Sequence, residues 1–345
     1  MKKYLSILVA AILMAGCLSA CGNGSAVTAG NEKLQIVTTI FPEYDWVMNV
    51  LGDNPAGAEV TMLLDSGVDL HSYQPTAADI LKISTCDLFI YVGGESDEWV
   101  EDALREVTND DQVVINLLEV LGDSVKEEEV VEGMQEEHEH EHDHEEGDHD
   151  EDEQEQEHEH EHEDGEIEYD EHVWLSLRNA SVLTEKISEA IQSVDPAHAN
   201  VYKTNTSSYL EKLDALDGEY KNTVAAGSVD TLLFGDRFPF RYLVDDYGLD
   251  YYAAFVGCSA ETEASFETIT YLSGKVDELS LHAIMTIEGT DHRIAETIRQ
   301  NTQTKDQQIL TMDSMQSVVA RDVENGASYL SAMEGNLNVL REALQ

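Results

Sequence analysis

Basic residues are scarce in this chain. Its 345 residues include 19 Lys and Arg against 71 Asp and Glu, which gives a formal net charge of −52 at pH 7. Nucleic acids are bound through basic surfaces that neutralise phosphates. The composition therefore excludes nucleic acid as a partner and favours a cation. The length is enough for two domains of ordinary size.

Cysteines and catalytic signatures are also few. Of four cysteines, Cys86 and Cys258 lie in separate apolar segments. Their number permits one disulfide, but nothing in the sequence brings them together, so we expect buried free thiols and no disulfide scaffold. The chain has no G-x-S-x-G motif and no phosphate-binding loop, so neither a hydrolase nucleophile nor a nucleotide site is indicated.

No apolar run is long enough to span a bilayer. The run 5–15 follows two lysines and predicts a cleaved targeting segment, residues 1–21. Two cysteines follow small residues as in the bacterial lipoprotein cleavage box. Cys21 in Leu-Ser-Ala-Cys-Gly matches better than Cys17, and an ordinary secretory signal is the alternative. Residues 22–32 read as a flexible tether. We expect an extracytoplasmic protein, lipid-anchored to the outer face of the bacterial cell membrane by two or three acyl chains, since one chain anchors weakly.

Histidine and carboxylate dominate one stretch, from about residue 136 to residue 172. Residues 127–171 hold 26 of the acidic residues and no Lys or Arg. Almost nothing there can be buried, yet acidity alone needs no histidines, and His-rich tracts are typical of metal binding. We predict metal capture, with a solvated acidic spacer as the alternative. The histidines that alternate with carboxylates are His138, His140, His142, His144, His149, His158, His160 and His162.

H-E-x-x-H matches occur in this stretch, among them 138–142 and 158–162. That motif forms a zinc protease site only when a packed helix fixes both imidazoles and the Glu base. The flanking residues here are mainly Asp and Glu and cannot pack a helix, so we interpret the matches as a result of His-Glu alternation. A zinc metallohydrolase is the least favoured function.

Strands and helices alternate along the rest of the chain, which favours an α/β fold with mainly parallel sheets. The predicted strands are 33–39, 59–64, 88–92, 113–117, 231–234, 251–255, 283–287 and 308–310. Parallel sheets carry ligand-binding loops at the carboxyl ends of their strands.

A long helix interrupts this alternation. Asp195 and Pro196 form a helix start signal, and helical spacing continues to about residue 226, a length of roughly 45 Å. Such a helix suits a strut between two lobes. We predict a first lobe at 33–195 that includes the acidic loop 127–171, a linking helix at 196–226 and a second lobe at 227–345.

Two histidine motifs carry a family resemblance. They read Asp69-Leu70-His71-Ser72-Tyr73-Gln74-Pro75-Thr76 and Asp170-Glu171-His172-Val173-Trp174. In this order, with Phe41-Pro42-x-Tyr44 near the start, they resemble the zinc and manganese class of metal-binding lipoproteins of ABC transporters. The family motifs carry proline where Leu70 and Glu171 stand here. The resemblance covers about residues 33–345.

The resemblance implies two lobes bridged by one long helix, with a metal between them. His71 and His172 match the first two family ligands, and Asp313 in Thr-Met-Asp-Ser-Met matches the last. A helix cap is the alternative role for Asp313. Glu288 matches a family Glu that lies near the ligands without binding the metal.

The third ligand position departs from the family. Aligning Phe240 and Tyr242 with the family aromatics places Arg237 where His or Glu is usual, and arginine has no lone pair to donate. Either Asp236 supplies an oxygen, or three protein ligands suffice. Arg237 could instead pair with an acidic group and orient it. Cys258 also follows a predicted strand and could face the metal cleft, but we expect it to be a buried structural thiol.

The predicted function follows from this site. Two histidines and carboxylates suit Zn²⁺, and Mn²⁺ is possible; the His-rich run favours zinc as the cargo. We expect a monomeric solute-binding lipoprotein that delivers Zn²⁺ to an ABC permease and is not an enzyme. The alternatives are a Mn²⁺-delivering member of the same family and an extracellular zinc-buffering or adhesin-like lipoprotein.

Overall fold

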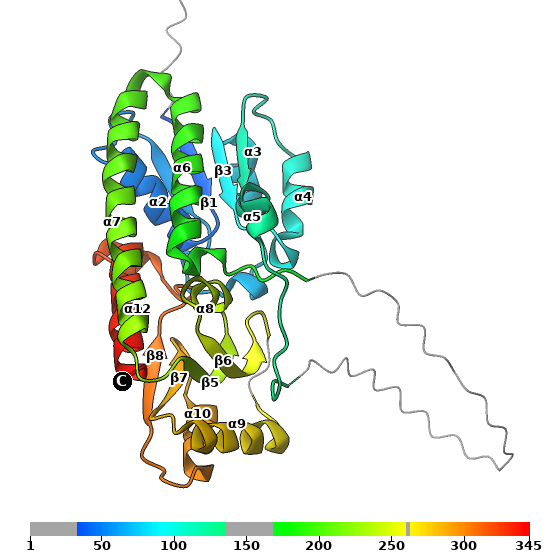
Figure 1. The fold of residues 1–345 in the computed structure, drawn as a ribbon. Helices are drawn as coiled ribbons and strands as arrows, with labels where there is room; N and C mark the ends of the chain where they lie inside the picture. Colours follow the sequence, from blue (N-terminus) through cyan, green and yellow to red (C-terminus); the bar gives the residue numbers. More distant parts are fainter. Residues whose placement is uncertain (1–32, 136–167, 260–262) are drawn as a thin grey trace, which may run out of the picture. The chain divides into compact units, whose positions relative to one another are not determined.

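A computed structural model describes residues 33–135, 168–259 and 263–345 (Figure 1). Residues 34–345 form one compact unit. Several predictions lie outside the described residues: the targeting segment 1–21, lipidation at Cys21 or Cys17, the tether 22–32, and the eight alternating histidines between 138 and 162.

The first sheet is parallel throughout, with strand order β2-β1-β3-β4. Its strands are β1 (Gln35–Thr38), β2 (Glu59–Met62), β3 (Leu88–Tyr91) and β4 (Val113–Asn116). The helices that follow them in turn are α2 (Phe41–Leu51), α3 (Ala77–Thr85), α4 (Trp99–Arg105) and α5 (Leu117–Leu121). The central strands β1 and β3 are largely buried, as expected for a parallel sheet covered on both faces.

The second sheet is also parallel, in the order β6-β5-β7-β8. Its strands are β5 (Thr231–Phe238), β6 (Asp250–Val256), β7 (Ala283–Ile287) and β8 (Gln308–Met312). Its helices are α8 (Arg241–Tyr247), α9 (Phe266–Leu279), α10 (Arg293–Asn301), α11 (Ala320–Glu324) and α12 (Tyr329–Ala343).

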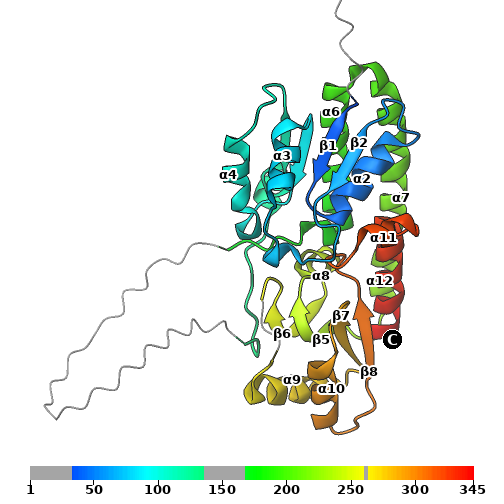
Figure 2. The same cartoon turned by 180° about the vertical axis from the view of Figure 1, so that it is seen from behind.

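Two long helices connect the sheets: α6 (Leu177–Val194) and α7 (Ala199–Ala226). Helix α7 packs on α2 and α6 beside the first sheet and on α8 and α12 beside the second (Figures 1 and 2). Its buried stripe includes Tyr209, Leu213, Leu216 and Tyr220, the residues that helical spacing places on one face. The predicted α/β class with two parallel-sheet lobes and a bridging helix is confirmed. The domain boundaries at 195–196 and 226–227 stay predictions.

The carboxyl ends of the two sheets face each other. The segment after β2 pairs with the segment after β8 through an antiparallel bridge between Ser66 and Val319. Trp174, just before α6, donates its indole N–H to the carbonyl of Ser314, 2.9 Å away. Loops from both lobes therefore meet in one region.

The stems of the acidic loop are paired with each other. Glu127 and Tyr169 form an antiparallel bridge. The Glu128 N–H donates to the Glu168 carbonyl, and the Asp170 N–H donates to the Lys126 carbonyl, each at 2.9 Å. Farther along the first stem, the Gln135 N–H donates to the carbonyl of Ala254 in β6. The first stem therefore lies against the second lobe.

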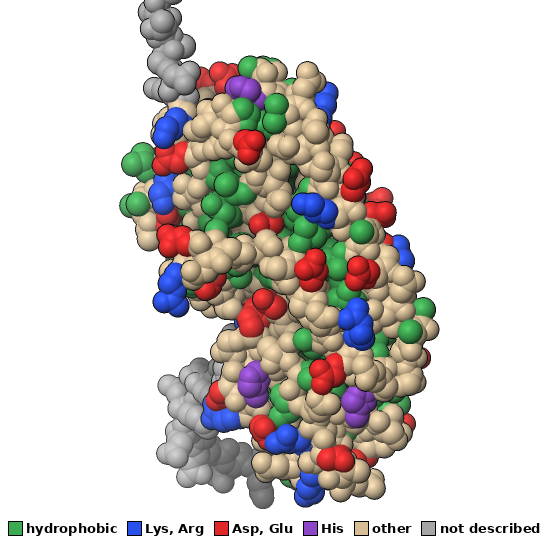
Figure 3. Space-filling view, turned by 90° about the vertical axis from the view of Figure 1, so that its left-hand side faces the viewer, with side chains coloured by type: hydrophobic (Ala, Val, Ile, Leu, Met, Phe, Trp, Pro, Cys, Tyr) green, Lys and Arg blue, Asp and Glu red, His purple; other side chains and the backbone are tan. Residues whose placement is uncertain are grey.

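The face covered by α7 and α12 carries acidic and basic side chains interspersed, without a continuous basic patch in this view (Figure 3). In the part of the chain that the structure describes, no helix is both long and apolar enough to cross a membrane.

Candidate metal site

His71 lies in a short 3₁₀ turn after β2, Leu70–Ser72. Asp69 caps this turn, because its Oδ1 accepts the His71 N–H at 3.1 Å. Leu70 is buried and anchors the turn to the core. The ring Nδ1 of His71 lies 2.7 Å from the hydroxyl of Ser96, in the turn Glu95–Asp97 after β3. With Nδ1 engaged, Nε2 is the nitrogen that can bind a metal.

His172 is fully buried at the start of the segment that leads into α6. Asp170 holds it twice: Oδ1 accepts the His172 backbone N–H at 2.8 Å and lies 3.0 Å from Nδ1. A carboxylate on Nδ1 fixes the tautomer and makes Nε2 the more basic donor. The Tyr329 hydroxyl donates to the Trp174 carbonyl at 2.6 Å and ties the segment to α12.

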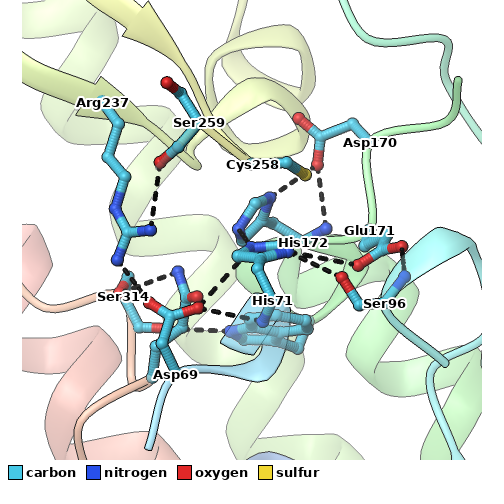
Figure 4. A network of polar contacts seen from close by, with 12 residues as sticks. Asp69, His71, Ser96, Asp170, Glu171, His172, Arg237, Cys258, Ser259 and Ser314 are labelled. Carbon is cyan, nitrogen blue, oxygen red and sulfur yellow. Dashed lines mark hydrogen bonds and ion pairs between the residues drawn. The ribbon is translucent and has the colours of Figure 1, made fainter. Parts of the chain in front are cut away.

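The two imidazoles converge on one point. Their Nε2 atoms lie 3.3 Å apart, and their ring centroids lie 5.2 Å apart (Figure 4). Two nitrogens that bind one zinc ion in tetrahedral geometry lie roughly 3.3–3.4 Å apart. The histidine pair has the spacing of a chelating site.

Protons compete weakly with a metal ion for His71. Burial, the neighbouring His172 and Arg237 lower the pKa of His71 to about 3, although Asp69 acts in the opposite direction. The His71 ring is therefore neutral at physiological pH, as metal binding requires.

Glu171 places a buried carboxyl group beside His71. Its Oε1 accepts the Ser96 N–H at 2.9 Å, and its Oε2 lies 3.5 Å from His71 Nδ1. Among the described residues, this buried Oε2 has no hydrogen-bond partner. Burial raises the pKa of the Glu171 carboxyl. The Glu171 side chain fits only because residue 94 is glycine. A Cβ on Gly94, which has φ +84°, would lie 2.3 Å from Glu171 Oε1.

Cys258 joins the histidines from the second lobe, just after β6. Its Sγ and one nitrogen of each of His71 and His172 all lie within 4.8 Å of one another. Cys86 and Cys258 are both free thiols, as predicted, but only Cys86 is buried, because Cys258 lies at a partly exposed strand end. Among the described residues, these three side chains form the group of His, Cys, Asp and Glu donors that could hold one metal ion, and neither Asp236 nor Asp313 belongs to it.

Arg237 pairs with Asp69, the residue that caps the His71 turn (Figure 4). The strand register of β5 shifts between Phe234 and Arg237, which marks a bulge before the arginine. The guanidinium also donates to the Ser259 carbonyl at 3.5 Å. Arg237 therefore connects the end of β5 to the first lobe through an acidic group.

Asp236 is buried, and both its oxygens are engaged. Oδ1 accepts the Arg237 N–H at 3.0 Å. Oδ2 accepts the Thr290 hydroxyl at 2.8 Å and the Ile287 N–H at 3.2 Å. Within the second lobe, this carboxylate joins β5 to the end of β7.

Asp313 and Glu288 organise the loop after β8. Asp313 Oδ1 accepts the Met315 N–H at 2.8 Å. Glu288 accepts the Ser314 N–H and hydroxyl, each at 2.7 Å. Burial and the Glu288 charge raise the pKa of Asp313 to about 6.

Two residues of this region were not predicted from the sequence: Ser96 and Glu128, whose Oε1 accepts the Cys258 N–H at 3.2 Å. Cys258 was expected to be a structural thiol. The available signal was the position of Ser96 and Cys258 shortly after the strands β3 and β6. In parallel sheets, such positions gather at one edge.

Known proteins are similar to this chain in sequence and fold. The sequence model of the family described as "Zinc-uptake complex component A periplasmic" matches residues 36–343. The high-affinity zinc uptake system protein ZnuA of Bacillus subtilis is 29% identical over 346 residues, which cover 99% of this chain and 98% of that protein.

A second curated relative is longer. The zinc-binding lipoprotein AdcA of Streptococcus pneumoniae serotype 4 is 30% identical over 340 residues, and the match spans 99% of this chain but 61% of AdcA. Among solved structures, the Zn(II)-bound ZnuA-like domain of the pneumococcal AdcA superposes with a TM-score of 0.66 at 25% identity. That match covers 90% of this chain and 99% of the domain.

Proposed function

The chain belongs to the family of zinc-uptake complex component A proteins, and on this premise we propose that it captures Zn²⁺ outside the cytoplasm and delivers it to an ABC permease. The observation that carries the proposal is the histidine pair, whose Nε2 atoms lie 3.3 Å apart while each Nδ1 is held by a neighbour. The family is one of transport components and not of enzymes. Its description as periplasmic supports an extracytoplasmic location.

Zinc suits the site better than manganese. Two imidazoles are borderline ligands that zinc accepts readily, whereas manganese favours harder oxygen donors. The two relatives described above carry zinc in their names. Of the two predicted oxygen ligands, Asp313 is better supported than Asp236, because the Oδ2 of Asp313 accepts no hydrogen bond from the described residues. Mn²⁺ delivery is the alternative within the same family.

The proposal is tested by the variants His71→Ala and His172→Ala. Each should lose the tightest zinc on equilibrium dialysis and fail to restore growth at low zinc in cells that depend on this protein. His198→Ala and His282→Ala are matched controls, since these rings bond Asp195 and the Glu342 carbonyl instead. Tight zinc that survives both site variants would contradict the proposal.

Deletion of the permease distinguishes a transport function from a zinc-buffering function. A zinc-buffering or adhesin-like lipoprotein would bind zinc equally well and need no permease. We expect that deletion of the permease abolishes the zinc uptake this protein supports. Uptake that persists without any permease would favour the buffering function.

The His-rich run has an auxiliary role in this proposal. Its second stem carries Asp170 and leads directly to His172, and its first stem contacts Cys258 through Glu128. Weak ligands tethered at this place raise the local zinc concentration. Replacing its eight histidines with serine should slow zinc loading at low zinc and leave the tight site intact. Unchanged loading and uptake would contradict the auxiliary role.

Lipid anchoring and a monomeric state complete the proposal. Cys21→Ser should release the protein from the membrane fraction, whereas Cys17→Ser should not. Light scattering of the released protein should give the mass of one chain. The opposite cysteine result would identify Cys17 as the lipidated residue.

A further inference from the structure

Cys258 is placed where a metal site would need a donor from the second lobe. The two histidines belong to the first lobe, and the position at which the family usually supplies a second-lobe ligand holds Arg237. The arginine is committed to Asp69 and to the Ser259 carbonyl. A site made of His71 and His172 alone would leave the second lobe without a ligand in this group.

We propose that the Cys258 thiolate is the third protein ligand of the transported zinc ion. The proposal rests on the zinc-capture function above and names a ligand for the same site. The Sγ atom and one nitrogen of each imidazole lie within 4.8 Å of one another. A tetrahedral zinc ion would hold sulfur and nitrogen roughly 3.5 Å apart, so these atoms need to approach by no more than about 1.3 Å.

The backbone after β6 is built for this approach. Gly257 lies against His172: a Cβ at residue 257 would come within 3.0 Å of the imidazole carbon Cε1 and 2.9 Å of the Phe238 carbonyl oxygen. A side chain there would push the strand end away from the ring. The Cys258 N–H donates to Glu128 Oε1 at 3.2 Å, which fixes the backbone of the residue that carries the thiol.

A second buried group also points to a cation. Glu171 is 2% exposed, and its Oε2 lacks a hydrogen-bond partner among the described residues while it lies 3.5 Å from His71 Nδ1. A carboxylate left in this state is costly, and a dication bound at His71 Nε2 would compensate its charge. This observation is independent of the cysteine.

The chemistry balances without a further reactant. Before metal binds, burial and the carboxylates of Glu128, Asp170 and Glu171 raise the pKa of the Cys258 thiol, which keeps it protonated. When the sulfur–zinc bond forms, the thiol releases its proton to solvent. Two imidazoles and one thiolate leave the fourth coordination position of a tetrahedral zinc ion for Asp313, the better supported of the two predicted oxygen ligands. A thiolate also selects zinc against manganese.

Cobalt(II) substitution tests this ligand directly, because a thiolate bound to Co²⁺ absorbs in the near ultraviolet and imidazole or carboxylate ligands do not. The full chain carries Cys17→Ser and Cys21→Ser, so that Cys86 and Cys258 are its only thiols. We expect a charge-transfer band that saturates at one cobalt per chain and is bleached by zinc. The band should be absent in Cys258→Ser and unchanged in the matched control Cys86→Ser.

Two further measurements distinguish the loss of a metal ligand from misfolding of the variant. In the Cys86→Ser background, zinc should slow alkylation of the unmodified Cys258, and His172→Ala should remove that protection. In Cys258→Ser, the zinc dissociation constant should rise at least ~10-fold. Removing a residue that only hydrogen-bonds a metal ligand already weakens metal binding by about that factor.

The outcomes distinguish this proposal from the one on which it rests. If zinc binds tightly through His71 and His172 but gives no thiolate band and no protection of Cys258, the cysteine is not a ligand and the zinc-capture proposal stands. If zinc binding is indifferent to both histidines, the zinc-capture proposal fails as well.

Discussion

At the scale of single residues, the site depends on groups that hold the imidazoles rather than on the imidazoles alone. Asp170 and Ser96 each engage an Nδ1 atom, and so direct both Nε2 atoms to one point. The two histidines could be predicted from their motifs. Their partners could be predicted less well, because Ser96 reaches His71 across 25 residues of sequence and Asp170 serves both the backbone and the ring of His172.

Removing the Asp170 carboxylate tests this holding role. In Asp170→Ala the His172 ring loses the partner that fixes its tautomer, so we expect zinc affinity to fall roughly 10–100-fold. Competition with a chelating indicator measures the change. The exposed residue Asp214 of α7 gives the control Asp214→Ala, and equal affinities in the two variants would contradict the role of Asp170.

Gly94 offers a second test at this scale. Gly94→Ala places a Cβ 2.3 Å from Glu171 Oε1 at φ +84°, whereas a Cβ at Gly122, at φ +51°, meets nothing within 4 Å. Both substitutions strain the backbone, but the first also overpacks the site, at a cost of roughly 1–3 kcal/mol. Denaturant unfolding should show Gly94→Ala to be the less stable variant by that amount. Equal stabilities would mean that Glu171 moves aside freely.

At the scale of elements, the strands were predictable and the turns between them were not. A buried run rich in β-branched residues, such as Ala283–Ile287, indicates a parallel strand by its composition. The bulge before Arg237 gives no such signal, because it depends on close packing: a Cβ at Gly235 would lie 2.6 Å from the Ala295 backbone. For the same reason, the sequence did not reveal how near Gly257 brings Cys258 to His172.

The turn Glu95–Asp97, which carries Ser96, makes a pH-dependent contribution to stability. Burial and the nearby Glu171 charge raise the pKa of Asp97 to about 7 from an ordinary value of 3.8, against the Gly93 N–H bond that lowers it. Between about pH 4 and pH 7, the folded chain therefore holds this proton more often than the unfolded chain does. The free energy of unfolding should fall as pH rises through this window, by at most about 1.4 kcal/mol per pH unit.

The variant Asp97→Asn isolates this effect. Its unfolding free energy should decline less steeply than that of the wild type between pH 4 and pH 7, and its stability at pH 7 should be higher. Exposed Asp111→Asn is the control. Parallel pH profiles for the wild type and Asp97→Asn would show that Asp97 does not titrate in this window.

At the scale of the whole molecule, the loops at the carboxyl ends of the two sheets meet through a small number of polar contacts. One is the Arg237–Asp69 ion pair, which joins β5 to the His71 turn and is about three-quarters buried. The sequence indicated that Arg237 could orient an acid but not which one, because the partner lies 168 residues away. Two parallel-sheet lobes and a bridging helix could be foreseen; the pairing of their facing loops could not.

Replacing Arg237 measures what this contact contributes. Arg237→Met leaves Asp69 partly buried without its cation, and we expect a loss of roughly 1–2 kcal/mol in unfolding free energy. Arg293→Met is the matched control, because the Arg293–Asp291 pair is largely exposed and should contribute little. If both variants lose the same stability, the ion pair does not help to join the lobes.

The central claim is that the transported zinc ion binds between His71 and His172. Anomalous diffraction at the zinc absorption edge, from crystals of the protein loaded with one zinc per chain, tests it most directly. We expect a single strong peak within bonding distance of both Nε2 atoms. A peak elsewhere, with these two nitrogens still in contact with each other, would contradict it.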